Sequence, residues 1–407
     1  MGIGERVGDG PILTRADVPP AQPGFEVQAV LNPATATLDG GDVILLLRVA
    51  ERPRSDVDPP ADALTLDLAG PHPKLVPLAR GYTKDDVVPI AFRDRVAGSP
   101  RYVAVYLPKD LPGLDTRDPR GVEFTHPKIG RRTTFLTQIS HLRCARSADG
   151  LHFSVDREPA IRPSSDLEEF GCEDARATKI DGRWYVTYTS VSRVGITSSL
   201  AITSDFATFE KHGAMLPPDQ KDLVLFPEKK DGGFMALTRP MPGSFGHVLG
   251  IWIAVPDGRL PWGSHRPLVL PREGKWDERH TGAGTVPFLC RDGWLEIYHG
   301  VDANLDYRLG AVLLDRDDPT KVLARSEEPI LGPERPYEME GLFPDVVFTC
   351  GHIPLDDRGE RIRVYYGAAD SSVAAADFSV SDILESLEGP DPRFGHDQRA
   401  VSRPLTT

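Results

Sequence analysis

Cysteine, basic clusters and long apolar runs are all scarce in this 407-residue chain, and each scarcity excludes a class of protein. The four cysteines stand far apart without a Cys-x-x-Cys pair, which argues against a zinc knuckle or a disulfide framework and predicts no metal site. The longest aliphatic run, Val43 to Leu47, is far too short to cross a bilayer. A net charge of −13 without a basic block would repel a polyanion, so we expect no nucleic-acid partner.

The first residues also lack the apolar segment of a secretory signal. We therefore expect a cytoplasmic protein that associates with no membrane and keeps its cysteines reduced. The sequence leaves open whether copies of the chain form a homo-oligomer.

Glycine and proline are abundant, with 38 of each, which is typical of short strands joined by turns. One unit recurs, a Gly or Asp-Gly turn followed by an apolar strand that ends in a small or charged polar residue. Its five copies are Gly40 to Arg48, Asp181 to Thr189, Asp231 to Arg239, Asp292 to His299 and Gly359 to Asp370. Such strands cover their apolar faces when neighbouring units stack in a ring, so the repeats predict an all-β, five-bladed β-propeller.

The interval between the first and second copies is longer than the others. Residues 52–132 include inserted loops in this interpretation, although Arg101 to Leu107 has the pattern of a strand. Helical periodicity is confined to short segments such as Ser379 to Leu387, in a C-terminal extension at residues 371–407. We predict a single propeller domain over residues 1–407, with an insertion that shapes either the mouth of a central site or an oligomer contact.

The most informative motif is Glu173-Asp174-Ala175-Arg176, which precedes the Asp-Gly turn at Asp181 and a strand that alternates aromatic and small polar residues. Two acids and a base before such a strand are typical of propeller enzymes that hold catalytic carboxylates at the inner edge of a blade. The motif therefore favours chemistry on a sugar. The structural alternative is that Asp174 is a strand-end acid paired with Arg176.

This motif and others in the same order resemble glycoside hydrolase family 130, the β-mannoside phosphorylases and related β-mannosidases. The resemblance extends from about Asn32 to Asp370 and includes Lys221-Asp222, Leu225 to Lys229, Thr238-Arg239-Pro240, Gly293 to Val301, Tyr337-Glu338, Asp345 to Phe348 and Tyr365 to Asp370. It implies a five-bladed propeller that cleaves β-mannosidic bonds of manno-oligosaccharides with inversion. Most members are phosphorylases that use inorganic phosphate and release mannose 1-phosphate, and a smaller set are hydrolases. No metal or organic cofactor is implied.

By this resemblance Asp174 is the acid, which sends its proton to the leaving oxygen through a hydroxyl of the bound mannose. The candidates for sugar binding are Asn32, Arg48, Glu173, Arg176, Tyr298, His299, Tyr337, Asp345 and Asp370, with Tyr366 as a further pocket residue. Phosphate binding needs several fixed cations around one point, and the candidates are Arg193, Lys221, Arg239 and His280. Inter-blade packing is the alternative for Tyr298, and a solvated surface position is the alternative for Lys229 and Lys230.

The chain departs from the usual family pattern at Ala175, Thr238, His280 and Asp345, where Pro, His, Lys and Asn are common. The residues at 238 and 280 remove or weaken positive charge near the expected phosphate site, and Asp345 adds negative charge. Phosphorolysis is therefore only narrowly favoured over hydrolysis by water. A hydrolase would need a carboxylate base, for which Glu228, Glu278 and Asp345 are the candidates.

Two functions of other kinds stay open. The first is a propeller that only binds a sugar or a protein partner, and the second is a retaining furanosidase of the same architecture. Acids and bases at the ends of consecutive repeats argue against the first, because a scaffold has no need of them there. The second needs a carboxylate nucleophile near an early strand, and the sequence offers no compelling one. The linkage, the leaving sugar and the chain-length preference do not follow from the sequence.

Overall fold

The computed structural model describes residues 2–70, 72–94, 101–118, 121–241, 248–256 and 263–389. In these ranges the chain is nearly all β. The helical elements are short and comprise η1 (Arg15–Asp17), η2 (Asp166–Glu168), α1 (Pro336–Met339) and α2 (Val380–Glu385). No helix in the described ranges is long and apolar enough to span a membrane.

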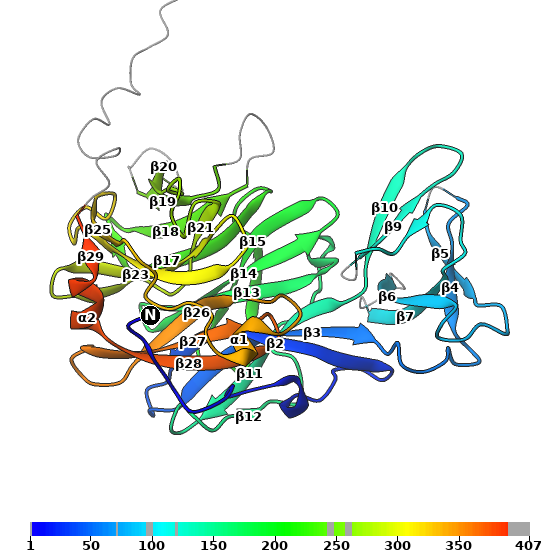
Figure 1. Cartoon of the computed structure of the whole chain (residues 1–407), viewed down its shortest axis with the longest axis horizontal. Helices are drawn as coiled ribbons and strands as arrows, with labels where there is room; N and C mark the ends of the chain where they lie inside the picture. The colour runs from blue at the N-terminus through cyan, green and yellow to red at the C-terminus, as the bar shows by residue number, and fades with distance from the viewer. Residues whose placement is uncertain are drawn as a thin grey trace, which may run out of the picture.

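Most strands belong to five antiparallel groups, numbered here in chain order (Figure 1). Group 1 contains β2 (Phe25–Thr37), β3 (Val43–Pro53), β11 (Ile139–Ser147) and β12 (Ser154–Val155). Group 2 contains β13 (Gly171–Ile180), β14 (Arg183–Ser192), β15 (Gly195–Thr203) and β16 (Glu210–Ala214). One parallel bridge, between Ser140 and Gly171, joins these two groups into a continuous eight-stranded sheet.

The remaining groups follow along the chain. Group 3 contains β17 (Gln220–Lys230), β18 (Gly233–Pro240), β19 (Ile251–Val255) and β20 (Ser264–Val269). Group 4 contains β21 (His280–Ala283), β22 (Phe288–Cys290), β23 (Gly293–Val301), β24 (Tyr307–Leu314), β25 (Val322–Ser326) and the late strand β29 (Leu387–Glu388). Group 5 contains β26 (Val347–Pro354), β27 (Arg361–Ala368), β28 (Ser372–Ser379) and the N-terminal strand β1 (Glu5–Arg6).

All five predicted repeat strands exist, as β3, β14, β18, β23 and β27. Each is the second strand of a hairpin, and each predicted turn is the turn of that hairpin. At Asp181-Gly182 both residues have positive φ, 50° and 78°, as the tight turn of a twisted hairpin requires. The Asp-Gly pairs therefore mark hairpins because Asp and Gly tolerate this backbone conformation.

Apolar side chains from neighbouring groups meet in five clusters. Strand β3 shows the pattern, because Ile44 and Leu46 face group 2 while Leu45 and Leu47 face group 5. Further clusters lie between groups 2 and 3, between groups 3 and 4, and between groups 4 and 5. Each group thus has an apolar cluster on both faces, one against each of two neighbours.

The segment between β3 and β11 folds into two small sheets. One contains β4 (Leu64–Asp67), β5 (Lys74–Pro77), β6 (Val87–Asp94) and β7 (Arg101–Pro108), and the other contains β8 (Leu114–Asp115), β9 (Gly121–Thr125) and β10 (Arg132–Leu136). The strand predicted at Arg101 to Leu107 is present as β7, but it pairs with β4 and β6 and not with any of the five groups. The expected inserted loops are thus mostly strands with an apolar cluster of their own.

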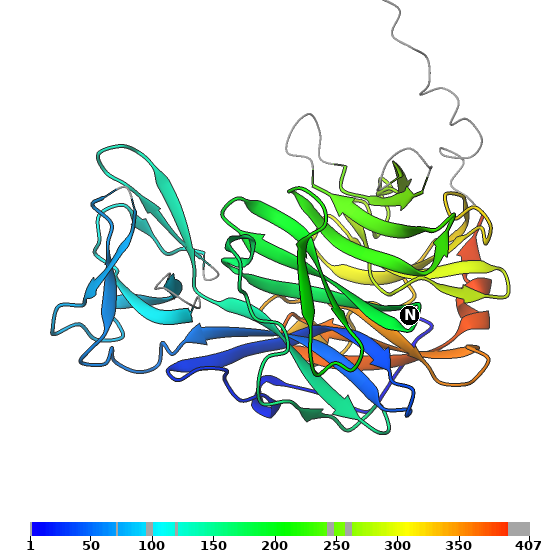
Figure 2. The same cartoon turned by 180° about the vertical axis from the view of Figure 1, so that it is seen from behind.

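Figures 1 and 2 show the inserted sheets projecting from one end of the body. Two side chains tie them to the segment before β13. Arg93 Nη1 donates to Asp166 Oδ1 at 2.8 Å, and the Tyr102 hydroxyl lies 3.0 Å from the carbonyl oxygen of Glu169. The insertion therefore contacts the body next to the strand that carries Asp174.

The predicted C-terminal helix is confirmed as α2, whose N-cap Ser379 accepts a hydrogen bond from the backbone of Asp382. After it, β29 adds to β25 and so attaches the chain to group 4. Residues 390–407 of the predicted extension lie outside the described residues.

Leu46→Ala tests whether the inter-group clusters hold the body together. Leu46 is fully buried between groups 1 and 2, so the substitution is expected to lower the free energy of unfolding by about 2–5 kcal/mol in urea titrations. The control is Leu323→Ala in β25, which is 37% exposed and is expected to change the free energy by less than about 0.5 kcal/mol. Equal losses in both variants would contradict the assigned core.

Candidate active site

Three consecutive groups carry a β-bulge in their first strand. Two residues occupy the place of one between Leu31 and Ala34, between Glu173 and Arg176, and between Lys221 and Val224. The first residue of each bulge has positive φ, 46° at Asn32, 47° at Asp174 and 54° at Asp222. Asn and Asp are the residues besides glycine that adopt this conformation most readily. The bulges turn three polar side chains out of the regular alternation at equivalent places.

Asp174 is at the centre of an acidic half of the site. Its Oδ1 accepts hydrogen bonds from Asn32 Nδ2 at 2.8 Å and from Arg48 Nη1 at 3.1 Å. Arg48 also donates from Nη2 to Glu173 Oε1 at 2.8 Å. The structure thus brings together four residues that the sequence analysis assigned to the site. The structural alternative paired the carboxylate of Asp174 with Arg176. This pairing is wrong, because the hydrogen bond from Arg176 to Asp174 goes to the backbone oxygen and not to the carboxylate.

Two of the carboxylates in this half, Asp174 and Asp370, have pKa values shifted in opposite directions. Burial raises the pKa of Asp174, but Arg48, Lys221 and the hydrogen bond from Asn32 together outweigh it and hold the pKa below its usual value. Asp370 lies in the turn between β27 and β28, where burial raises its pKa to about 6 and the charges of Asp174 and Glu173 act in the same direction. The site can therefore hold one proton on Asp370 while Asp174 is ionised.

Asp222 is at the centre of a basic half of the site. Arg176 Nη2 lies 3.3 Å from its Oδ1, and Arg239 Nε lies 2.9 Å from its Oδ2. Burial raises the pKa of Asp222, but the charges of Arg239 and Arg176 lower it by more than burial raises it. The carboxylate is therefore ionised. Lys221 precedes it, pairs in register with Arg239, and forms no ion pair within the described residues. The charges of Arg176, Arg239 and Lys221 exceed that of Asp222, which suits this half to an anion.

Two neutral histidines lie beside Asp222. His299 is fully buried, its Nε2 lies 3.7 Å from Asp222 Oδ2, and burial lowers its pKa far below the ordinary value. Burial also lowers the pKa of His280 to about 3, with Arg239 acting in the same direction. Gly282 makes room for this arrangement, because a Cβ there would lie 2.5 Å from both His299 Nε2 and Asp222 Oδ2. Neutral imidazoles can donate to an anion without adding charge.

Two predicted site residues, Arg176 and Tyr298, are buried and form their hydrogen bonds with other groups of the protein. Arg176 is only 1% exposed and donates to the carbonyl oxygens of Ala283 and Gly284, so it connects groups 2 and 4 through buried bonds. Tyr298 is fully buried, and its hydroxyl bonds to Asp277 and Arg325. These placements argue against direct sugar contact by either residue and favour the packing alternative for Tyr298.

The remaining sugar-binding candidates lie in group 5 or next to it. Asp345 is half-buried with φ 59°, and its carbonyl oxygen accepts from the backbone of Tyr307 at 3.0 Å. Tyr337, in α1, packs against the cluster between groups 4 and 5. Tyr366 is fully buried, with its hydroxyl 2.7 Å from Glu338 Oε1, so it does not line a pocket.

Three other basic residues and the candidate base Glu228 lie apart from the two halves. Arg193 is exposed just after β14, where its guanidinium pairs with Glu169, and its Nε lies 2.6 Å from Glu169 Oε2. Lys229 pairs with Asp181, and Lys230 bonds to a backbone oxygen, which supports the surface alternative for both. Glu228 is exposed in β17, six residues beyond Asp222, which in an extended strand is about 20 Å along the chain.

Of the other two candidate bases, Glu278 accepts a hydrogen bond from the Gly274 backbone at 3.0 Å. This bond occupies one carboxylate oxygen with the local turn. Asp345 is connected to the site through Tyr307, whose backbone N–H donates to the Asp345 carbonyl oxygen and whose ring lies beside that of His299.

Sequence reasoning missed two kinds of site residue. Asp222 belongs to the Lys221-Asp222 motif, but its pairing with two arginines depends on the bulge in β17. No residue pattern in the sequence predicts that bulge. Tyr307 and Phe348 surround His299, with ring centroids 6.1 Å and 4.4 Å away. Their positions result from the packing of groups 4 and 5, and the spacing of aromatics in the sequence does not indicate it.

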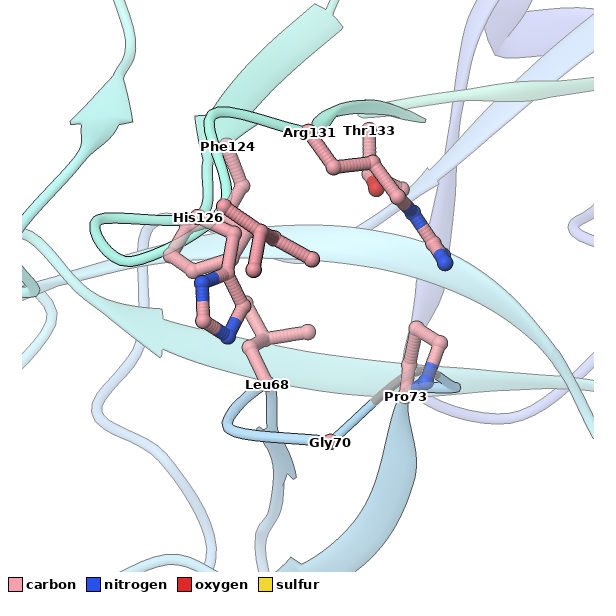
Figure 3. Close-up of a pocket in the computed structure, with 8 residues that line it drawn as sticks. Leu68, Gly70, Pro73, Phe124, His126, Arg131 and Thr133 are labelled. Carbon is pink, nitrogen blue, oxygen red and sulfur yellow. The ribbon is translucent and has the colours of Figure 1, made fainter.

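A separate hollow of about 270 Å³, including solvent at its mouth, lies in the inserted sheets (Figure 3). Figure 3 shows Leu68, Phe124 and Pro73 around it, and no residue of the acidic or basic half lines it. Its ionisable lining groups, His126 and Arg131, are not buried. The converging polar groups, and not this hollow, define the candidate site. Among the described residues no group of three or more His, Cys, Asp or Glu could hold a metal ion.

Comparison with known proteins gives concordant matches. Residues 132–389 match the model of glycoside hydrolase family 130, described as β-1,4-mannooligosaccharide phosphorylase. The β-1,2-mannobiose phosphorylase of Listeria innocua is 38% identical over 383 residues, which are 94% of this chain and 98% of that protein. The 1,2-β-oligomannan phosphorylase of Thermoanaerobacter sp. is 40% identical over 258 residues, which are 63% of this chain and 84% of that protein.

A solved structure agrees with these matches. The solved structure of the Listeria innocua β-1,2-mannobiose phosphorylase in complex with β-1,2-mannobiose superposes with a TM-score of 0.77 at 37% identity. The match covers 94% of this chain and 98% of that structure.

Asp370→Asn tests the electrostatics of the acidic half. A carboxyl whose pKa is raised on folding stabilises the protein below its unfolded pKa, and this contribution is lost as the pH rises through the folded value of about 6. We therefore expect the variant to be more stable than the wild type by about 1–2 kcal/mol at pH 8, with the difference vanishing near pH 4. Urea unfolding over this pH range measures the difference. A variant equally stable or less stable at pH 8 would contradict the assignment.

Proposed function

The chain belongs to glycoside hydrolase family 130, and from this we propose that it cleaves β-mannosidic bonds by phosphorolysis, with inversion, to give mannose 1-phosphate. The substrate is a manno-oligosaccharide, and inorganic phosphate is the co-substrate. The reaction needs no metal or organic cofactor, and we propose that it takes place in the cytoplasm. We therefore favour a phosphorylase over a hydrolase and over a propeller that only binds sugar.

The observation that carries the proposal is the juxtaposition of two halves of opposite charge. Arg176 bridges them, because it bonds to the backbone oxygen of Asp174 at 2.9 Å and to the carboxylate of Asp222 at 3.3 Å. One half offers carboxylates and an amide that suit sugar hydroxyls, and the other offers cations that suit phosphate. An inverting phosphorylase needs an acid and an anionic nucleophile on opposite faces of one sugar, and this division supplies both.

The proton balance of the reaction fits this arrangement. Phosphate attacks the anomeric carbon, the glycosidic C–O bond breaks, and the leaving oxygen takes up the proton that Asp174 supplies through the mannose hydroxyl. The proton that phosphate loses on attack restores Asp174, so no net proton is consumed. Without ligands, the carboxylate of Asp174 is ionised. A phosphate dianion bound next to Lys221 repels this negative charge, which raises the pKa of Asp174 and favours its protonated form.

We further propose that the five groups are the blades of a five-bladed β-propeller. The supporting observation is the succession of apolar clusters between groups 1 and 2, 2 and 3, 3 and 4, 4 and 5, and 5 and 1. Strand β1, from the N-terminus, completes group 5 beside β28. A ring of five blades is the arrangement in which every group covers both of its apolar faces with its neighbours.

For the linkage we propose β-1,2. The similarity to the Listeria innocua β-1,2-mannobiose phosphorylase extends over 94% of this chain and therefore includes much of the inserted sheets, which the match to the family model omits. The insertion connects the end of β3 to the start of β11. These two strand ends lie beside the start of β13, because Ile139 pairs with Glu51 and Ser140 pairs with Gly171. The insertion is thus placed to shape the mouth of the site, where the leaving sugar binds.

A phosphate-dependence assay tests the proposal. With β-1,2-mannobiose, product should form only when inorganic phosphate is present and should be mannose 1-phosphate, detected by phosphorus NMR or ion chromatography. With β-1,4-mannobiose at the same concentration the rate should be at least about tenfold lower, which corresponds to about 1.4 kcal/mol in the transition state. Equal rates with and without phosphate, and free mannose as the product, would refute phosphorolysis.

Asp174→Asn tests the proposed acid. The substitution keeps the shape of the side chain but removes the proton donor, so kcat/KM should fall by about 10²–10⁴-fold. Glu228→Gln is the matched control at the far end of the neighbouring first strand, and its kcat/KM should stay within about twofold of the wild type. Unchanged turnover in a folded Asp174→Asn preparation would remove the assignment.

A further inference from the structure

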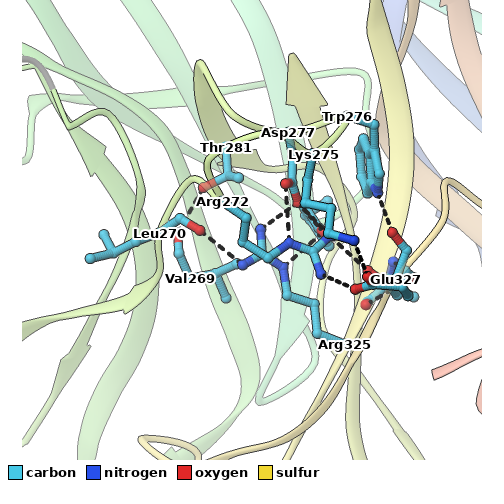
Figure 4. Close-up of polar contacts among 12 residues, drawn as sticks. Val269, Leu270, Arg272, Lys275, Trp276, Asp277, Thr281, Arg325 and Glu327 are labelled. Atoms are coloured by element: carbon cyan, nitrogen blue, oxygen red, sulfur yellow. Dashed lines mark hydrogen bonds and ion pairs between the residues drawn. The ribbon is translucent and has the colours of Figure 1, made fainter. Parts of the chain in front are cut away.

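Among the described residues, two buried aspartates each lie between two arginines, and they differ in how far their hydrogen bonds are satisfied. The first is Asp277, which Figure 4 shows between Arg272 and Arg325. Arg272 donates to it through Nε at 3.1 Å and Nη2 at 2.9 Å, and Arg325 donates through Nη2 at 2.6 Å. The Tyr298 hydroxyl adds a further bond at 3.0 Å. Both carboxylate oxygens of Asp277 are therefore satisfied within the protein.

The arginines around Asp277 are also bonded elsewhere. Arg272 donates to the carbonyl oxygen of Ser326 at 2.8 Å, and Arg325 donates to that of Leu270 at 2.8 Å. A buried network in which donors and acceptors match fixes a local structure and leaves little capacity for a ligand. The Asp277 network is thus a structural support behind β23.

The second aspartate, Asp222, is equally buried but incompletely bonded. Arg239 Nε is 2.9 Å from Asp222 Oδ2, but the two atoms are not aligned as a hydrogen bond, and both lack a hydrogen-bond partner. Both ring nitrogens of His299 are buried without a partner as well. Unsatisfied polar atoms of this kind are rare inside proteins, because each costs about 1–3 kcal/mol. Here several of them lie around one point next to Gly282.

We infer that Asp222 is a positioning residue for phosphate, which holds Arg239 in the orientation that binds the anion and is itself not a ligand. This inference rests on the proposed phosphorolysis. Asp222 lies against the Arg239 guanidinium at Nε and so restricts the orientation of that planar group. Arg176, on the other carboxylate oxygen, is fixed to the backbone of group 4 and so anchors Asp222 in turn.

The register of the strands supports this function. Lys221 pairs with Arg239 across β17 and β18, so both cations lie at the same level of the sheet. Asp222 follows in the bulge, where its positive φ turns the carboxylate toward Arg239. The neutral His299, whose Nε2 lies 3.7 Å from the same oxygen, adds a donor without charge. A bound phosphate completes the bonding that the protein leaves unfinished.

Asp222→Asn and the matched control Asp277→Asn test the inference together. Each substitution removes one buried charge from between two arginines, so both are expected to destabilise the protein, which thermal unfolding measures. Only Asp222→Asn should raise the KM for inorganic phosphate, by about 10–100-fold, while the KM for the mannoside stays within about threefold. Asp277→Asn should leave both KM values within about threefold. A folded Asp222→Asn variant with an unchanged phosphate KM, or equal effects of the two substitutions, would overturn the inference.

A comparison of Arg239→Gln with the double variant covers the case in which Asp222→Asn does not fold alone. Because Asp222 acts through Arg239, adding Asp222→Asn to Arg239→Gln should leave the phosphate KM of the Arg239→Gln variant unchanged within about twofold. The double variant removes the charges of Asp222 and Arg239 together, and Arg176 keeps its bonds to the backbone oxygens of Asp174, Ala283 and Gly284. A further rise in the phosphate KM would show that Asp222 contacts phosphate itself and would overturn the positioning role.

The wild type separates this inference from the proposed function. If the wild type forms product without phosphate and its melting temperature does not rise with inorganic phosphate, both the proposed function and the inference are wrong. If the wild type depends on phosphate and Asp222→Asn does not weaken it, only the inference is wrong.

Discussion

The bulges at Asn32, Asp174 and Asp222 are the constraint on which the candidate site depends. In a regular strand, alternate side chains enter the apolar clusters on the two faces of a group. A bulge with positive φ releases one residue from this alternation in each of three consecutive groups. Asn32 and Asp174 can then meet although 142 residues separate them, and Arg176 connects Asp174 to Asp222.

A consequence of this geometry is that strongly interacting charges are concentrated in a small buried region. Arg48 compensates Glu173 and Asp174, and Arg176 and Arg239 compensate Asp222, but Asp370 is left with a raised pKa. Such a region costs stability that the apolar clusters between groups must supply. Near Asp222, unpartnered atoms of Asp222, Arg239 and His299 lie close together, whereas the carboxylate oxygens of Asp277 are all bonded.

Much of the fold could be predicted from the sequence because its signals are local. The five repeat strands and their turns follow from Asp-Gly pairs and apolar runs, and the C-terminal helix follows from its periodicity. The fold of the insertion was harder to predict, because its strands are short and pair only with other strands of the insertion. In the site, the Glu173-Asp174 motif and the family resemblance identified the acidic half. The central position of Asp222, the buried position of Arg176 and the packing position of Tyr298 could not be predicted, because they depend on strand bulges and on contacts between distant groups.

The central claim is that one sugar and one phosphate bind between the two halves. The crystal structure of the protein with mannose and inorganic phosphate tests it most directly. The account predicts phosphate oxygens within about 3 Å of the Arg239 and Lys221 nitrogens, and a mannose hydroxyl within about 3 Å of the Asp174 carboxylate. Phosphate bound without contact to Arg239, or mannose bound away from Asp174, would contradict it.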